Sequence, residues 1–236
     1  MYKMRHRVRY SEISPDRRVN MEQIVKYFQD CSTFDSENIH QGLDYLEEKG
    51  YTWLLAGWQI QITRYPEFGE EITIATWPYG RKGILAYRNF EICDMEGNQL
   101  AAANSIWFYM NVKTGVPKKL EEEDVSAYGQ KEKLPLPEKP RKIKIPEGDK
   151  EQKAEFYVKK ADLDTNGHVN NARYVEMALE YLEDYDKIVS MRADYRKSAV
   201  FGDKIIPVVL RRDNTIYTEL LNEKKEPYVL IEFECL

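Results

Sequence analysis

The stretch DLDTNGHVNNARY, residues 162–174, is the most informative part of this chain of 236 residues. It places carboxylate, amide and imidazole side chains side by side. Gly167 can take backbone conformations that are closed to other residues, and Asn170 or Asn171 can cap a helix that begins there. The free N–H groups of a first helical turn favour negative charge nearby. The stretch therefore predicts a polar turn that leads into a helix.

A helix and a run of strands are expected around this stretch. Apolar residues recur at helical spacing after residue 171: Tyr174, Val175, Ala178, Tyr181 and Leu182. Alternating apolar residues between turn signals predict strands at residues 155–159, 190–198, 203–211, 215–222 and 228–234. One helix among antiparallel strands indicates a curved sheet wrapped around a central helix, which is the hot-dog fold.

The N-terminal half repeats this order of elements. A strand is expected at residues 4–12, then a helix whose apolar face holds Met21, Ile24, Val25, Phe28 and Cys31. Further strands are expected at residues 52–64, 71–78, 85–94 and 99–111. Residues 18–20 mirror residues 168–170, and residues 68–70 mirror residues 201–203. The fold class expected is therefore α+β, a tandem hot-dog.

The segment 113–150 stands apart because it holds half of the ten prolines and is dense in Lys and Glu. Proline removes backbone donors and biases its predecessor to extended conformations, so the segment is interpreted as a linker. The expected units are residues 1–112 and 151–236. The internal pair would make the chain a monomer with a pseudo-dimer, or it could associate further as a homodimer.

Composition narrows the functional class. With 42% hydrophobic residues and a net charge of −5, the chain is neither disordered nor basic enough to suggest nucleic-acid binding. The three cysteines are odd in number and far apart, which indicates a reducing, cytoplasmic setting. No signal peptide and no membrane span are expected. His6 and His40 lack ligand partners at useful spacing, so no metal and no cofactor are predicted.

The chemistry suggested by residues 162–174 is hydrolysis of a thioester. Asp164 can act as base or nucleophile, His168 can move a proton or polarise the carbonyl, and Asn166 can orient substrate or water. N–H groups at the helix start can stabilise an oxyanion. The alternative is structural, since Asp and Asn before a helix are commonly caps and a lone His is more often structural than catalytic.

The signature resembles that of the acyl-acyl-carrier-protein thioesterases, which include plant plastid enzymes and bacterial relatives. Their second hot-dog unit carries Asp-Leu-Asp-x-Asn-x-His-Val-Asn-Asn-x-x-Tyr, and this chain matches it without a gap. The resemblance implies hydrolysis of fatty acyl thioesters of an acyl carrier protein. It implies Asp164, Asn166 and His168 as catalytic residues. Asn170 and Asn171, the candidate helix caps, are predicted to support them.

One departure from the family bears on mechanism. Plant members read Glu-Tyr-Arg-Arg-Glu-Cys in a downstream strand, where residues 194–199 read DYRKSA. Ala199 excludes a mechanism that needs that Cys as nucleophile, and Ser198, in place of the acidic residue, could still hold a water. We expect Asp164 to work with water, either as nucleophile or as general base.

The first unit is expected to be non-catalytic, because Arg18 stands in place of the histidine and the Asp-x-Asn-x-His set is absent. In the resembled family this unit forms the acyl-chain pocket. The helix residues that could contribute here, or that simply pack the core, are Met21, Ile24, Val25 and Phe28. Asp30, Asp35 and Glu37 are expected to form a solvated helix face.

Two basic clusters, residues 118–119 and 141–144, could contact an acidic carrier protein or could be solvated linker charge. Competing functions stay open at this point. An acyl-CoA thioesterase would use the same chemistry, and a non-enzymatic acyl-binding hot-dog protein would use the same fold. A hot-dog dehydratase or hydratase lacks support, since no second catalytic histidine motif is found.

Overall fold

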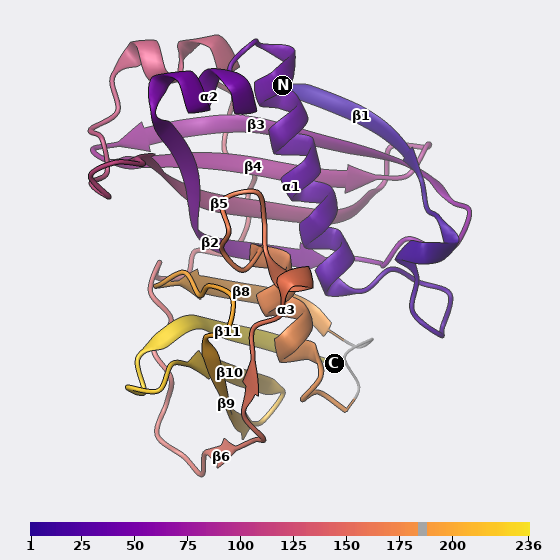
Figure 1. Ribbon diagram of the computed structural model, residues 1–236. Coiled ribbons are helices and arrows are strands. Elements are labelled where there is room, and N and C mark those ends of the chain that lie inside the picture. Colours follow the sequence, from indigo (N-terminus) through magenta and orange to yellow (C-terminus); the bar gives the residue numbers. More distant parts are fainter. Residues whose placement is uncertain (184–187) are drawn as a thin grey trace. The chain divides into compact units, whose positions relative to one another are not determined.

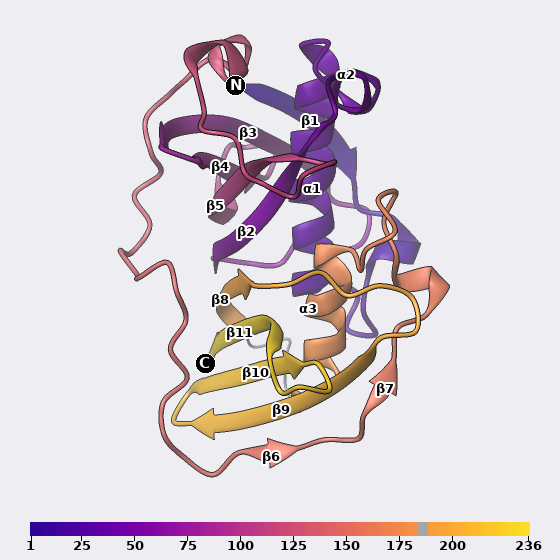
Figure 2. The same ribbon diagram turned by 60° about the vertical axis from the view of Figure 1, so that its left-hand side comes forward.

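The computed structural model describes residues 1–183 and 188–236. The chain divides into two compact units: unit 1 is Met1–Ala56 with Ile60–Pro137, and unit 2 is Gly57–Gln59 with Glu138–Leu236. Each unit combines one main helix with an antiparallel sheet, as Figures 1 and 2 show. The α+β class predicted from the sequence is therefore confirmed.

Unit 1 is built on one long helix laid against a sheet. Its elements are β1 (Tyr2–Arg7), η1 (Tyr10–Glu12), α1 (Met21–Asn38), α2 (Leu43–Lys49), β2 (Tyr51–Ile62), β3 (Glu71–Lys82), β4 (Leu85–Cys93), β5 (Gln99–Asn111), η2 (Glu122–Asp124) and η3 (Ser126–Tyr128), where η denotes a 3₁₀ helix. The strand order is β1-β3-β4-β5-β2. The apolar stripe of α1 is buried, and Phe28 packs on Phe90 of β4 with ring centroids 5.2 Å apart.

The structure corrects three expectations for unit 1. The first strand ends at Arg7, because the Glu12 carboxylate accepts the Arg9 N–H at 2.7 Å and closes a 3₁₀ turn. The helix α2 was not predicted. Asp35 is buried rather than solvated, and it accepts a hydrogen bond from Arg88 at 2.6 Å. It lies four residues after Cys31 on the inner helix face, and its partner on β4 is too distant in sequence for a local pattern to reveal.

Unit 2 repeats the plan on a smaller scale. Its elements are β6 (Glu151–Gln152), β7 (Phe156–Tyr157), η4 (Lys160–Asp162), α3 (Asn171–Leu179), β8 (Ile188–Tyr195), β9 (Lys204–Arg212), β10 (Thr215–Leu221) and β11 (Pro227–Cys235). The strand order is β8-β11-β10-β9-β6, and β7 also pairs with β9. The four long strands and the helix lie close to the predicted positions, whereas the strand expected at 155–159 is only two residues long.

The segment 113–150 contains core residues despite its prolines. Leu120, Tyr128 and Ile143 are all buried. Lys118, interpreted from the sequence as a carrier contact or as solvated linker charge, instead binds the Asp124 carboxylate at 2.6 Å and is mostly covered. The charge pattern alone could not show that this lysine is used within the chain.

Candidate active site

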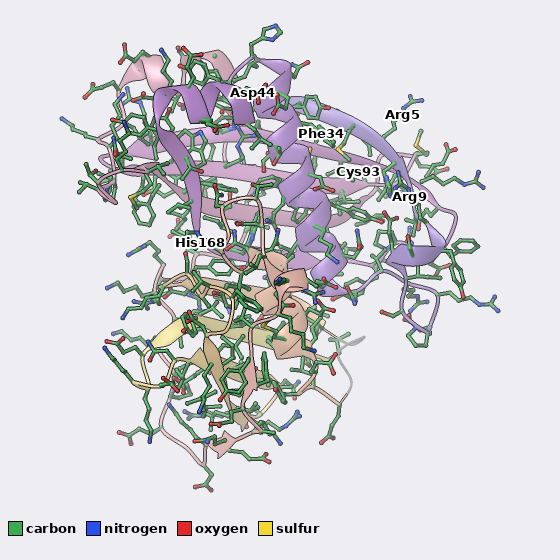
Figure 3. All side chains as sticks on the ribbon, in the orientation of Figure 1. Arg5, Arg9, Phe34, Asp44, Cys93 and His168 are labelled. Atoms are coloured by element: carbon green, nitrogen blue, oxygen red, sulfur yellow. The ribbon has the colours of Figure 1, made fainter. Side chains whose placement is uncertain are left out.

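The catalytic residues predicted from the sequence occupy the loop between η4 and α3; His168 is labelled in Figure 3. The Asp164 carboxylate is fixed through one oxygen, because Oδ1 accepts the N–H of Asn166 at 2.8 Å and the N–H of His168 at 3.1 Å. The Asp164 N–H in turn donates to the His168 carbonyl at 2.7 Å. Among the described residues, Oδ2 accepts no hydrogen bond. This oxygen can therefore meet water or substrate.

Gly167 closes this loop in a conformation that favours glycine. Its φ is +75°, in the left-handed region, which other residues enter only at a cost. Its N–H donates to the Asp164 carbonyl at 3.1 Å. The glycine thus allows the backbone to turn back and present the amides that hold the carboxylate.

The loop is anchored to the turn that follows β8. His168 forms a backbone bridge with Val200, and the Val169 N–H donates to the Ala199 carbonyl at 2.9 Å. The Ala199 N–H donates to the Tyr174 hydroxyl at 2.8 Å. Burial raises the pKa of the Tyr174 phenol. The phenol therefore stays neutral, and its oxygen accepts the hydrogen bond from Ala199. The loop is therefore held on two sides.

The helix start is capped as expected, and this limits one part of the predicted chemistry. The Asn170 side chain accepts the Ala172 N–H at 2.9 Å, and its carbonyl accepts the Arg173 N–H at 3.0 Å. These two amides are already engaged and cannot also stabilise an oxyanion. Asn171 opens α3, and its carbonyl accepts the Tyr195 hydroxyl at 3.0 Å.

Comparison with known proteins now assigns the family. The acyl-ACP thioesterase N-terminal domain model matches residues 1–128, and the C-terminal domain model matches residues 146–227. The chain belongs to the acyl-ACP thioesterase family. The family resemblance inferred from residues 162–174 is confirmed.

Individual relatives agree with this family assignment. The chain is 26% identical over 84% of its length to the chloroplastic palmitoyl-acyl carrier protein thioesterase of Arabidopsis thaliana, and it spans about half of that relative, 52%. An acyl-ACP thioesterase structure from Bacteroides thetaiotaomicron matches with a TM-score of 0.89 and 25% identity, covering 98% of this chain and 96% of that one.

A structure from Lactobacillus plantarum, provisionally assigned as an oleoyl thioesterase, matches with a TM-score of 0.86 and 26% identity over 100% of this chain and 96% of that one. Both structural matches extend over practically the whole of each chain. They confirm the double hot-dog fold predicted from the order of elements.

One residue that supports the site was not singled out from the sequence. Asp162 is buried, and its carboxylate accepts the Lys159 N–H at 2.7 Å and a guanidinium N–H of Arg173 at 3.0 Å. Its carbonyl accepts the Asn170 N–H at 2.9 Å. Asp162 thus connects η4 to α3 on either side of the loop. The signal was present, since Glu12 holds the same place before α1 in unit 1.

The residues predicted to support the site and to bind the acyl chain lie in different parts of the chain. Ser198 is exposed, three residues beyond the end of β8. The four residues of α1 proposed for the acyl chain are fully buried; these are Met21, Ile24, Val25 and Phe28. Core packing explains their burial, so a role in acyl binding stays a prediction.

Two further findings concern the described part of the chain. No group of three or more His, Cys, Asp and Glu side chains there is arranged to hold a metal ion. None of its helices is both long enough and apolar enough to cross a membrane.

Proposed function

We propose that this protein hydrolyses fatty acyl thioesters of acyl carrier protein, releasing a fatty acid and the carrier thiol and so ending chain elongation. The family assignment over both domains supports the reaction class. The observation that carries the proposal is the Asp164 carboxylate, held at Oδ1 by two backbone amides and unoccupied at Oδ2 among the described residues. Asn166 and His168 stand on the same five-residue loop.

In the proposed mechanism Asp164 activates a water molecule. As Oδ2 takes a proton from the water, the water oxygen forms a bond to the thioester carbonyl carbon. Polar hydrogens of Asn166 and His168 stabilise the negative charge on the carbonyl oxygen. Collapse of the tetrahedral intermediate breaks the carbon–sulfur bond, and the thiolate takes up the proton that Asp164 removed. The enzyme returns to its starting state without a cofactor.

In this proposal one unit carries the catalytic residues and the other binds the acyl chain. Residues 151–236 carry the chemistry, with Asn170 and Asn171 shaping the helix start and Ser198 holding a water. Residues 1–112 hold the acyl chain along the inner face of α1. Residues 113–150 connect the two.

A thiol-release assay tests the function. We expect thiol from acyl-carrier-protein esters of graded chain length, with a higher kcat/KM than for coenzyme A esters of the same acyl groups. A higher kcat/KM on coenzyme A would reassign the carrier. Tight acyl binding without thiol release would make the protein an acyl-binding protein instead.

Single turnover in ¹⁸O-labelled water separates the two roles open to Asp164. With Asp164 as general base, the label enters the fatty acid in the first turnover. With Asp164 as nucleophile, an acyl anhydride forms first, and hydrolysis at its aspartyl carbonyl places the label in the protein. Mass spectrometry of product and of the peptide that contains Asp164 reads both outcomes.

A further inference from the structure

Unit 2 has an exposed corner beside the catalytic loop. We call the side chains of Lys159, Lys160, Val200 and Phe201 the basic corner. Phe201 is 58% exposed and Val200 is 43% exposed, and both lysines are exposed. The Lys160 ammonium lies 5.7 Å from the centre of the Phe201 ring. The corner thus joins apolar surface to positive charge.

Backbone hydrogen bonds hold the basic corner in place. The Val158 N–H donates to the Asp203 carbonyl at 2.9 Å, and the Gly202 N–H donates to the Val158 carbonyl at 3.1 Å. The Val200 N–H donates to the Asp203 carboxylate at 3.0 Å. Because Val200 also bridges to His168, the corner is continuous with the loop that carries the catalytic residues.

The two lysines of the basic corner have no carboxylate partner in the part of the chain that the structure describes. Across the described residues, neither Lys159 nor Lys160 forms an ion pair with a carboxylate, whereas the neighbouring Lys204 binds Glu155 at 3.0 Å. This local positive charge stands on a chain whose net charge is −5. Exposed aromatic surface beside free cations is typical of a contact site for an acidic partner.

Unit 1 has the corresponding corner with less positive charge, because only one exposed cation stands there, Arg9 in the place of Lys159. Tyr10 and Phe68 take the places of Lys160 and Phe201, with ring centroids 6.3 Å apart. Glu67 takes the place of Val200 and pairs with Arg18 at 3.2 Å. Phe68 is 54% exposed, so an exposed aromatic residue is common to both corners. Within the described residues, the corner in unit 2 therefore has two exposed cations without an ion pair, and the corner in unit 1 has one.

We propose that the basic corner binds an acidic surface of the acyl carrier protein. The inference rests on the proposed function, because the carrier must bring its thioester to Asp164. Lys159 and Lys160 attract the carrier, and Phe201 and Val200 provide apolar contact beside the loop. The thioester then enters from the side of His168.

The test compares a carrier-bound thioester with the same acyl group on N-acetylcysteamine, which has no protein to dock. The double variant Lys159→Glu/Lys160→Glu should raise KM for the carrier substrate at least about fivefold, and Phe201→Ala should act in the same direction. Neither should change turnover of the small thioester by more than about twofold. Raised ionic strength should weaken binding of the carrier substrate to the wild type and much less to the double variant.

The matched control is Phe68→Ala, which removes a similarly exposed aromatic side chain from the less basic corner of unit 1. Its KM for the carrier substrate should stay within about twofold of the wild type. A rise equal to that of Phe201→Ala would overturn the assignment to the basic corner. So would variants of the corner that slow the small thioester as much as the carrier substrate.

Direct binding separates this proposal from the proposed reaction. Fluorescence anisotropy with labelled, phosphopantetheinylated carrier protein measures docking without turnover. If the wild type binds the carrier and the double variant does not, docking stands even where no thiol is released. If the double variant binds the carrier as tightly as the wild type, docking at this corner is overturned, while thiol release by the wild type would still support hydrolysis.

Discussion

The turns before the two main helices, residues 14–18 and 164–168, share one backbone design but differ in chemistry. The Ser14 N–H donates to the Arg18 carbonyl at 2.8 Å, as the Asp164 N–H does to the His168 carbonyl at 2.7 Å. Each turn is followed by an asparagine cap, Asn20 or Asn170. The turn geometry is therefore a property of the hot-dog unit, and the side chains distinguish the turn that we propose to be catalytic from the turn in unit 1.

The carboxylates of the two turns sit at different positions. In unit 1 the turn is closed by Asp16, whose Oδ1 accepts the Arg18 N–H at 3.1 Å. In unit 2 the turn is closed by Asp164, which lies two positions earlier in the repeat. Its Oδ1 accepts hydrogen bonds from two backbone N–H groups. Both turns thus hold a carboxylate that accepts a backbone N–H. Its position beside an amide and an imidazole is the feature that differs.

The largest expected effect comes from Asp164→Asn. The amide keeps an oxygen for the two backbone N–H groups but cannot accept a proton, so kcat should fall by about 10³-fold with little loss of stability. Asp16→Asn, the matched change in unit 1, should alter kcat less than about twofold. Thiol release at saturating substrate and thermal unfolding of both variants measure this. Equal losses in the two variants would show that the carboxylates are structural.

His168→Ala comes next and should lower kcat by about 10²-fold, because the imidazole is lost while the backbone bridge to Val200 remains. Arg18→Ala, the matched change, removes an exposed ion pair with Glu67 and should leave kcat unchanged. Both proteins should stay folded by circular dichroism. Activity of His168→Ala within about a factor of three of the wild type would remove His168 from the mechanism.

Glu12 of unit 1 and Asp162 of unit 2 occupy the same place in the repeat, and we expect Glu12 to affect stability and not catalysis. It takes the place of Asp162, but it accepts hydrogen bonds from His6 at 2.8 Å and Tyr27 at 2.9 Å. Burial alone would raise the pKa of Glu12, yet the hydrogen bonds from His6, the Arg9 amide and Tyr27 lower it below its usual value. Glu12→Gln should therefore reduce the free energy of unfolding by about 2 kcal/mol near neutral pH, without lowering kcat.

The sign of the pH dependence follows from that lowered pKa. The ionised Glu12 stabilises the folded state above about pH 4.3, the ordinary value for glutamate, and this contribution is lost as pH falls through the lower folded-state pKa. The difference between wild type and Glu12→Gln should shrink below about pH 4. Urea unfolding across roughly pH 3–7 measures it. A constant difference at all pH values would contradict the role of the charge.

Periodicity and the repeat predicted most of the fold, because α1 and α3 each bury an apolar face and turn signals separate the strands. The sequence also placed the three catalytic candidates on one loop before α3. Contacts between residues that are far apart in the sequence were not predicted. The buried pair of Asp35 and Arg88 joins residues 53 positions apart, which no local pattern encodes. The amides engaged at the start of α3, in contrast, follow from the asparagine cap that the sequence predicted.

The smallest expected effect tests the shared turn itself. Gly167 and Arg17 occupy the same place in the repeat and both have positive φ, +75° and +68°. A Cβ at Gly167 would meet nothing within 4 Å, so Gly167→Ala should lower the free energy of unfolding by about 1 kcal/mol through backbone strain alone. It should also lower kcat, since the strained turn carries the amides that hold Asp164.

The matched change Arg17→Gly relieves strain but adds freedom to the unfolded chain, so the free energy of unfolding should stay within about 0.5 kcal/mol of the wild type. Urea unfolding of the pair measures both, and a stabilised Gly167→Ala would mean that the turn does not require the left-handed residue on which the position of Asp164 depends.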